Sequence, residues 1–235
     1  MMGTNKVLKE RARGSLEGNH STAASALLLY FLLLAAAVWI FFTAGPGPLA
    51  YAMSAALSVI LLIFSLMLQA GLTYMFLGLA RDRRAVVYDL FYACRTHPDN
   101  ACKLSVLLLA INLAIMIPFS VISYRLLPHT LLSEVLAQLV LAAVLFIVDL
   151  RYAFVFCIFA DSPFMKASEI MKKSRLMTLG HHLHLARLRL SFAGDLLLSV
   201  TSLGIGFLWT VPYIQTTISH FYLDLLTLRP ESSAV

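Results

Sequence analysis

Long uncharged stretches of apolar residues constrain this chain more than any other feature. Residues 24–42 and 49–80 contain no Asp, Glu, Lys or Arg. An apolar helix of about 20 residues, rising about 1.5 Å per residue, matches the ~30 Å hydrocarbon core of a bilayer. Several such stretches in 235 residues, with 60% hydrophobic content and a mean hydropathy of +0.84, exclude a soluble core. The sequence therefore predicts an all-α, polytopic transmembrane helix bundle.

Charge and turn signals divide the chain into about six spans, although the sequence is also compatible with five. Residues 1–20 are expected to form a basic amphipathic tail, residues 21–228 a single transmembrane domain, and residues 229–235 a short C-terminal tail. Gly204 and Gly206 indicate a turn that divides the last apolar region in two. The predicted spans are residues 21–43, 49–80, 102–125, 131–160, 184–202 and 207–226.

The distribution of Lys and Arg predicts the orientation in the membrane. Four lie in the N-terminal tail, five between the second and third spans, and six between the fourth and fifth spans, whereas the turns on the opposite side offer only Arg125. Basic loops are retained on the cytoplasmic side of a bilayer. We therefore expect a multi-pass cell-membrane protein whose N-terminus and C-terminus are both cytoplasmic.

Composition also excludes several classes of function. The net charge of +6 comes from these loops, and no compact basic patch with interleaved aromatic residues indicates a nucleic-acid partner. Cys94, Cys102 and Cys157 have no metal-site spacing, and two of them lie in a predicted cytoplasmic segment, so we expect no disulfide. The histidines of residues 181–184 lack the further ligands that a metal needs. The sequence thus predicts no metal and no cofactor.

Catalytic motifs are also missing from the sequence. It contains no G-x-S-x-G, Walker loop or H-E-x-x-H pattern. We therefore assign no catalytic residue and favour a non-enzymatic protein.

Three amphipathic segments are predicted on the cytoplasmic face. Apolar residues recur at helical spacing in residues 8–16, 87–94 and 167–177, with charged residues mostly on the other side. Such helices lie in the headgroup region, where each basic residue gains about 1 kcal/mol from anionic lipid. They either dock a lipid or a partner, or simply anchor the loops. The candidate contact residues are Arg84, Arg95, Lys166, Lys172, Lys173 and Arg175.

Three charged residues fall inside predicted spans: Asp149, Arg151 and Asp195. A charge at the bilayer centre costs about 2.5–3.5 kcal/mol on insertion scales, so each needs a partner or water. Asp149 and Arg151 are two residues apart and point to different sides of a helix. Asp195 is a candidate partner for Arg151. The three residues form a polar site between the fourth and fifth spans, fix helix packing, or reach a nearby interface.

Short motifs follow one another in a set order along the C-terminal half of the chain. Residues 152–163 read Y-A-F-V-F-C-I-F-A-D-S-P, and further motifs lie at residues 177–180, 190–192, 204–206, 208–209, 212–213 and 221–222. Together with Asp89-Leu90-Phe91 in the N-terminal half, this order resembles an uncharacterised bacterial integral membrane family catalogued as domain of unknown function 975. The resemblance covers most of the chain and implies a bacterial cell-membrane protein with several spans and no established activity.

The chain departs from that family pattern at two places. Val144-Leu145 stand where a Pro-Gly bend is usual, and Asp195 replaces a customary Trp after Gly194. Both lie close to the predicted polar site.

Two functional hypotheses remain. The leading one is an accessory or assembly factor that docks anionic lipid headgroups or a membrane-protein partner through its cytoplasmic face. The second is a small transporter or lipid-handling protein with Asp149, Arg151 and Asp195 around its site. Either is compatible with a homo-oligomer.

Overall fold

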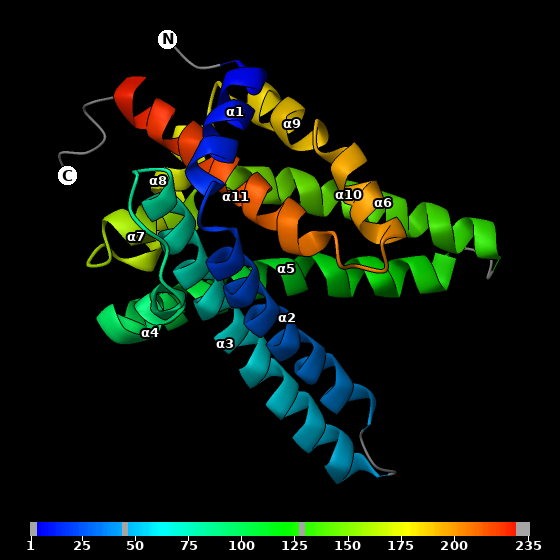
Figure 1. Ribbon diagram of the computed structural model, residues 1–235. Helices are drawn as coiled ribbons and strands as arrows, with labels where there is room; N and C mark the ends of the chain where they lie inside the picture. Colours follow the sequence, from blue (N-terminus) through cyan, green and yellow to red (C-terminus); the bar gives the residue numbers. More distant parts are fainter. Residues whose placement is uncertain (1–3, 44–46, 127–129, 229–235) are drawn as a thin grey trace.

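The computed structural model describes residues 4–43, 47–126 and 130–228, and these residues form helices with no strand among them. This confirms the all-helical prediction (Figure 1). The elements are α1 (Asn5–Leu16), α2 (His20–Phe42), α3 (Pro48–Leu79), the 3₁₀-helix η1 (Val87–Phe91), α4 (Tyr92–Thr96), α5 (Pro98–Leu126), α6 (Leu131–Arg151), α7 (Val155–Asp161), α8 (Ala167–Thr178), α9 (His182–Leu190), α10 (Ala193–Thr201) and α11 (Phe207–Leu228). The predicted tail of residues 229–235 lies outside the described residues.

Four segments are long and apolar enough to cross a membrane: His20–Ile40, Pro48–Leu79, Pro98–Arg125 and Leu131–Asp161. They correspond to the first four predicted spans, which supports the membrane class of the chain.

The prediction of six spans is not confirmed. The fifth predicted span divides at Ser191 and Phe192 into α9 and α10, which have nine residues each, and a nine-residue helix is only about 14 Å long. α11 has 22 residues, but Gln215, His220 and Asp224 interrupt its apolar sequence. The helices of the C-terminal third are therefore shorter or more polar than the four long apolar segments.

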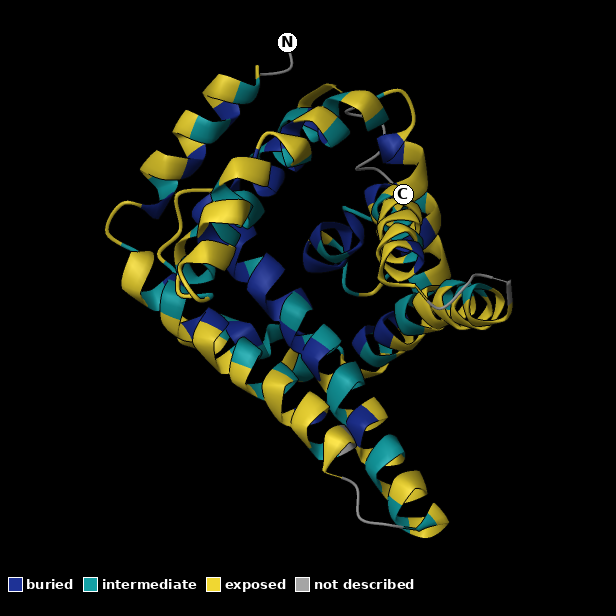
Figure 2. Ribbon diagram, turned by 90° about the vertical axis from the view of Figure 1, so that its right-hand side faces the viewer, coloured by how far each residue is buried: buried dark blue, intermediate teal, exposed yellow. Residues whose placement is uncertain are grey.

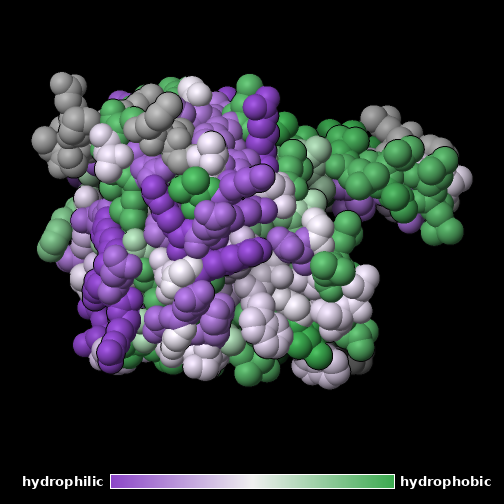
Figure 3. Space-filling model, turned by 45° about the horizontal axis from the view of Figure 1, so that its top comes forward, coloured by the Kyte–Doolittle hydropathy of each residue, from purple (hydrophilic) through white to green (hydrophobic). Residues whose placement is uncertain are grey.

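Two helical hairpins project from a compact region and diverge from each other (Figure 1). We call α2–α3 the first arm and α5–α6 the second arm. The compact region, here called the base, contains α1, η1, α4, α7, α8 and α9 with the adjoining ends of the longer helices. Hydrophilic side chains gather over the base, whereas the projecting arm in Figure 3 is mostly hydrophobic.

The base holds the hydrophobic core. Its fully buried aromatic side chains are Phe76, Phe154, Phe159, Phe192, Phe221 and Tyr222. The second arm, in contrast, exposes most of its residues (Figure 2). In their most apolar stretches, 39% of α3 is buried within the protein but only 6% of α5. The second arm therefore depends on lipid or another protein to cover it.

The amphipathic segments use their apolar faces within the protein. Leu8, Ala12 and Leu16 of α1 are at most 1% exposed, and Leu90 of η1 is fully buried. In α8 the buried residues include Ile170, Met171 and Met177. Core packing therefore already buries most of these apolar faces, whereas Val87 of η1 is 38% exposed. The expected insertion between lipid headgroups stays a prediction.

Residues 152–154 form a turn between α6 and α7. α6 itself is continuous through Val144 and Leu145, the positions where the family pattern has a bend. With 21 residues, α6 is about 31 Å long and alone matches the hydrocarbon core. The excess length of the fourth predicted span thus belongs to the base.

α3 has 32 residues, more than a bilayer needs. Its C-terminal third lies in the base, which accounts for the excess length of the second predicted span. There Gly71 meets the backbone of Leu90 so closely that an added Cβ would overlap the Leu90 carbonyl group. Because glycine has only a hydrogen atom in place of Cβ, η1 can cross α3 at this point.

We expect Gly71→Ala to lower the free energy of unfolding by about 1–3 kcal/mol, because packed backbone has to move apart. Gly78→Ala is the matched control on the same helix, since its Cβ would meet only the Arg83 side chain at 3.8 Å. Denaturant unfolding in detergent measures both. Equal stability of the two variants would contradict the close crossing.

Leu8→Ala tests the docking of α1. We expect a loss of about 2–4 kcal/mol, because the side chain is fully buried and its removal leaves a cavity. Val7→Ala is the control, since Val7 is 37% exposed, and it should cost less than about 1 kcal/mol. A small effect of Leu8→Ala would mean that α1 lies on lipid instead.

Candidate functional site

A polar cluster fastens the elements of the base together. The Arg81 guanidinium donates two hydrogen bonds to the Asp161 carboxylate at 2.7 and 2.9 Å, and the Tyr222 hydroxyl donates to the same carboxylate at 3.0 Å. The hydrogen bond to Asp161 raises the pKa of Arg81. Because these residues follow α3, end α7 and belong to α11, the cluster joins three parts of the chain. Asp161 and Tyr222 lie in two of the segments that carry the family resemblance, but the sequence indicated no contact between them or with Arg81.

A second set of polar contacts holds α1 against α11 and against the junction between α9 and α10. Arg11 pairs with Asp224 at 3.2 Å, Ser15 is hydrogen-bonded with His220 at 3.0 Å, and Lys9 lies 3.9 Å from the centre of the Phe192 ring. Burial lowers the pKa of Lys9. These contacts, together with the buried face of α1, make the N-terminal segment part of the base.

The structure places Asp149 and Arg151 in the last turn of α6, next to the base. Asp149 forms an ion pair with Arg189 of α9. Arg151 is exposed on the surface of the base. Both charged residues therefore lie near the end of a helix whose length matches the thickness of a hydrocarbon core.

Asp195 does not take the place expected for it. It lies in α10 and lines a cavity of about 410 Å³ with Arg13, Glu17, His20 and Trp209 among others. The described residues contain no ion pair between Asp195 and Arg151. The expected pairing is wrong because the break between α9 and α10 carries Asp195 away from α6, while Arg189 reaches Asp149.

Basic residues from three helices surround one cavity of about 310 Å³. Its lining is Arg151, Lys172, Arg175, Leu176, Leu179 and His182. We call it the basic pocket. Arg151 is the last residue of α6, His182 is the first of α9, and the others belong to α8 or follow it directly. None of the lining residues is acidic, so the three permanent cations repel one another until an anion lies between them.

Two contacts fix the walls of the basic pocket. The Ser174 hydroxyl donates a hydrogen bond to the Arg151 carbonyl oxygen at 3.2 Å, which ties α8 to the end of α6. The Asp149–Arg189 pair ties α6 to α9. Arg151 also stands at the C-terminal end of a helix, where the backbone dipole favours a cation. These contacts thus fix the helices that carry the pocket, while the side chains of Arg151, Lys172 and Arg175 are exposed.

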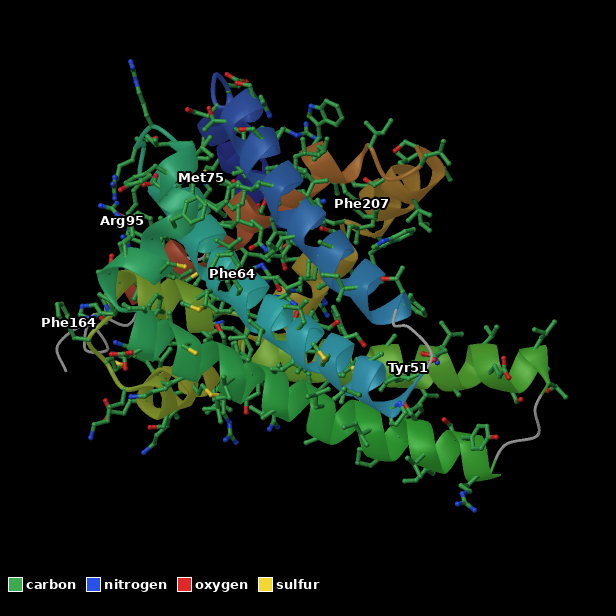
Figure 4. The ribbon with its side chains drawn as sticks, turned by 90° about the horizontal axis from the view of Figure 1, so that it is seen from below. Tyr51, Phe64, Met75, Arg95, Phe164 and Phe207 are labelled. Atoms are coloured by element: carbon green, nitrogen blue, oxygen red, sulfur yellow. The ribbon has the colours of Figure 1, made fainter. Side chains whose placement is uncertain are left out.

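The other predicted contact residues lie elsewhere. Arg95 stacks on Tyr88 at 4.1 Å and stands at the base end of the molecule (Figure 4). Lys166 lines a wider cavity of about 790 Å³ with Lys103 and Asp99 among others. Arg84 is exposed before η1, and Lys173 is half-buried. The structure therefore brings Arg151, Lys172 and Arg175 together and leaves the remaining four apart.

Groups for metal or thiol chemistry are not assembled in the described part of the chain. It contains no cluster of three or more His, Cys, Asp or Glu that could hold a metal ion. Cys94, Cys102 and Cys157 are free thiols, and burial raises the pKa of Cys94.

A family model described as "Protein of unknown function (DUF975)" matches residues 1–229. No curated protein and no solved structure matches the chain. Since the match covers nearly the whole sequence, the chain belongs to the DUF975 family.

Proposed function

We propose that this DUF975 protein is a non-enzymatic accessory or assembly factor of the bacterial cell membrane, which binds the phosphate headgroup of an anionic phospholipid in its basic pocket. The observation that carries the proposal is the meeting of Arg151, Lys172 and Arg175 around one cavity without an acidic lining residue. A phosphate accepts hydrogen bonds from all three side chains and cancels their mutual repulsion.

The position of the pocket favours a lipid over a soluble anion. The pocket begins at the last residue of α6, about 31 Å from the helix start, which is the level where headgroups lie. Leu176 and Leu179 add an apolar wall and are about half exposed. A cationic rim beside an apolar wall suits a phosphate with its attached acyl chains.

The charge distribution supports a cytoplasmic base. Among the described residues, Arg125 is the one Lys or Arg near the far end of an arm, and the other basic side chains gather towards the base. Positive loops remain cytoplasmic and meet the anionic leaflet there. Under the proposal both arms cross the bilayer and the basic pocket opens to the inner headgroup layer.

The pocket lining supports binding more than chemistry. Arg, Lys and Leu side chains supply no nucleophile at neutral pH, and His182 has no carboxylate beside it in the lining to orient it as a general base. A lining without a nucleophile or an oriented general base supports the proposal of a binding role.

The binding test uses the purified full chain and two lipids, phosphatidylglycerol and phosphatidylcholine. We expect wild-type protein to retain phosphatidylglycerol in native mass spectrometry, and Arg151→Gln with Arg175→Gln to weaken it at least tenfold, at about 1 kcal/mol per charge removed. Phosphatidylcholine should bind weakly to both.

Arg84→Gln with Arg95→Gln is the matched control, because it removes the same charge from elsewhere on the base. It should leave the affinity within twofold of wild type. If both double variants weaken phosphatidylglycerol equally, binding depends on net charge and the pocket is not the site.

A second candidate function is a small transporter or lipid-handling protein. It is favoured by the Asp149–Arg189 pair, which closes the junction of α6 and α9 beside the basic pocket. If that junction opens for a substrate, Asp149→Asn should abolish transfer of labelled lipid between the leaflets of proteoliposomes while headgroup binding remains. Unchanged lipid transfer would contradict this second function and leave the accessory role as the proposal.

A further inference from the structure

The second arm has a narrow seam where its two helices meet. Beyond the base, the residues of this arm that are not exposed recur mostly at every fourth position, while their neighbours on either side are almost all exposed. The seam residues are Ile111, Ile115, Phe119 and Ser123 in α5 and Ser133, Ala137, Leu141 and Leu145 in α6. Two flanks of the arm, one on each side of this seam, are left uncovered by the chain.

The two flanks differ in polarity. The residues that directly precede the seam positions are all apolar: Ala110, Ala114, Pro118 and Ile122 in α5, and Leu132, Leu136, Val140 and Val144 in α6. The residues that directly follow them include most of the arm's polar side chains: Asn112, Ser120 and Tyr124 in α5, and Glu134 and Gln138 in α6.

Helix geometry puts these followers on one side of the hairpin. Each step along an α-helix turns the side chain by about 100° in a right-handed sense. Because α5 and α6 run in opposite directions, a step past the seam leads to the same flank from either helix. The arm thus has one wholly apolar flank, suited to lipid, and one polar flank.

Two side-chain amides on the polar flank lie well away from the tip of the arm. Asn112 lies 14 residues before the end of α5, or about 21 Å from it, and Gln138 lies about 10 Å from the start of α6. Both are exposed. The Asn112 amide donates to its own helix at the Leu108 carbonyl oxygen, and the described residues offer Gln138 no side-chain hydrogen bond. Amides facing hydrocarbon lack the partners that water would supply.

We infer that the polar flank of the second arm is an interface with a second copy of this chain, with Asn112 and Gln138 bonding across it. Two copies with the same orientation are related by a two-fold axis along the membrane normal, so residues near the axis meet their own copies at equal depth. A carboxamide both donates and accepts, and therefore pairs with itself. Interhelical amide bonds of this kind stabilise association within bilayers. The inference is independent of headgroup binding.

Disulfide cross-linking in membranes tests the interface. Met116 and Ala114 flank the same seam residue, Ile115, at nearly equal depth, and both are exposed. With a mild oxidant, Met116→Cys should give a covalent dimer at least fivefold more abundantly than Ala114→Cys. The wild-type chain, with its three native thiols, measures the background.

Adding Asn112→Leu to Met116→Cys should reduce the dimer about fivefold. Adding Asn112→Gln instead, which keeps the amide, should preserve most of the dimer. Equal cross-linking at Met116 and Ala114, or none at Met116, would overturn the inference. So would a Met116→Cys adduct that contains a different protein, since the flank would then have a partner other than a second copy.

Discussion

The hydrocarbon core of a bilayer does not hydrate charged groups, and the rest of this structure follows from that constraint. Ionisable side chains are sparse along the arms and gather in the base, where short helices and water are available to them (Figure 3). α6 stops after 21 residues at Arg151, so a sequence block that looked like one over-long span is a membrane-length helix followed by a turn and α7. Asp149 and Arg151 are tolerated because the helix ends beside them.

Once the charges are collected in the base, they organise it. Arg81, Asp161 and Tyr222 join segments that are 61 to 80 residues apart in the chain. α1 is held both by its buried leucines and by polar contacts to α9 and α11. The basic pocket is a consequence of the same packing, since Ser174 and the Asp149–Arg189 pair fix its three walls. The side chains of Arg151, Lys172 and Arg175 line this one cavity, and its lining contains no carboxylate.

Sequence alone predicted the features that depend on composition. The uncharged blocks gave the helical class and the first four apolar helices, and the spacing of Leu8, Ala12 and Leu16 correctly marked a helix with one apolar face. It could not tell whether that face meets lipid or protein, because both are equally apolar partners. It also identified Arg151, Lys172 and Arg175 separately, but their meeting depends on how α8 folds back onto α6. The wrong pairing of Arg151 with Asp195 has the same origin, since the break at Ser191 and Phe192 has no Pro or Gly to indicate it.

We propose that the arms cross the membrane and that the basic base lies in the cytoplasm. Labelling with a membrane-impermeant maleimide tests it most directly, using Arg125→Cys near the far end of the second arm and Lys172→Cys in the basic pocket, with the wild-type chain as the blank. In intact spheroplasts we expect Arg125→Cys to be labelled and Lys172→Cys to be labelled only after permeabilisation. Labelling of Lys172→Cys from outside, or of both positions, would contradict the account.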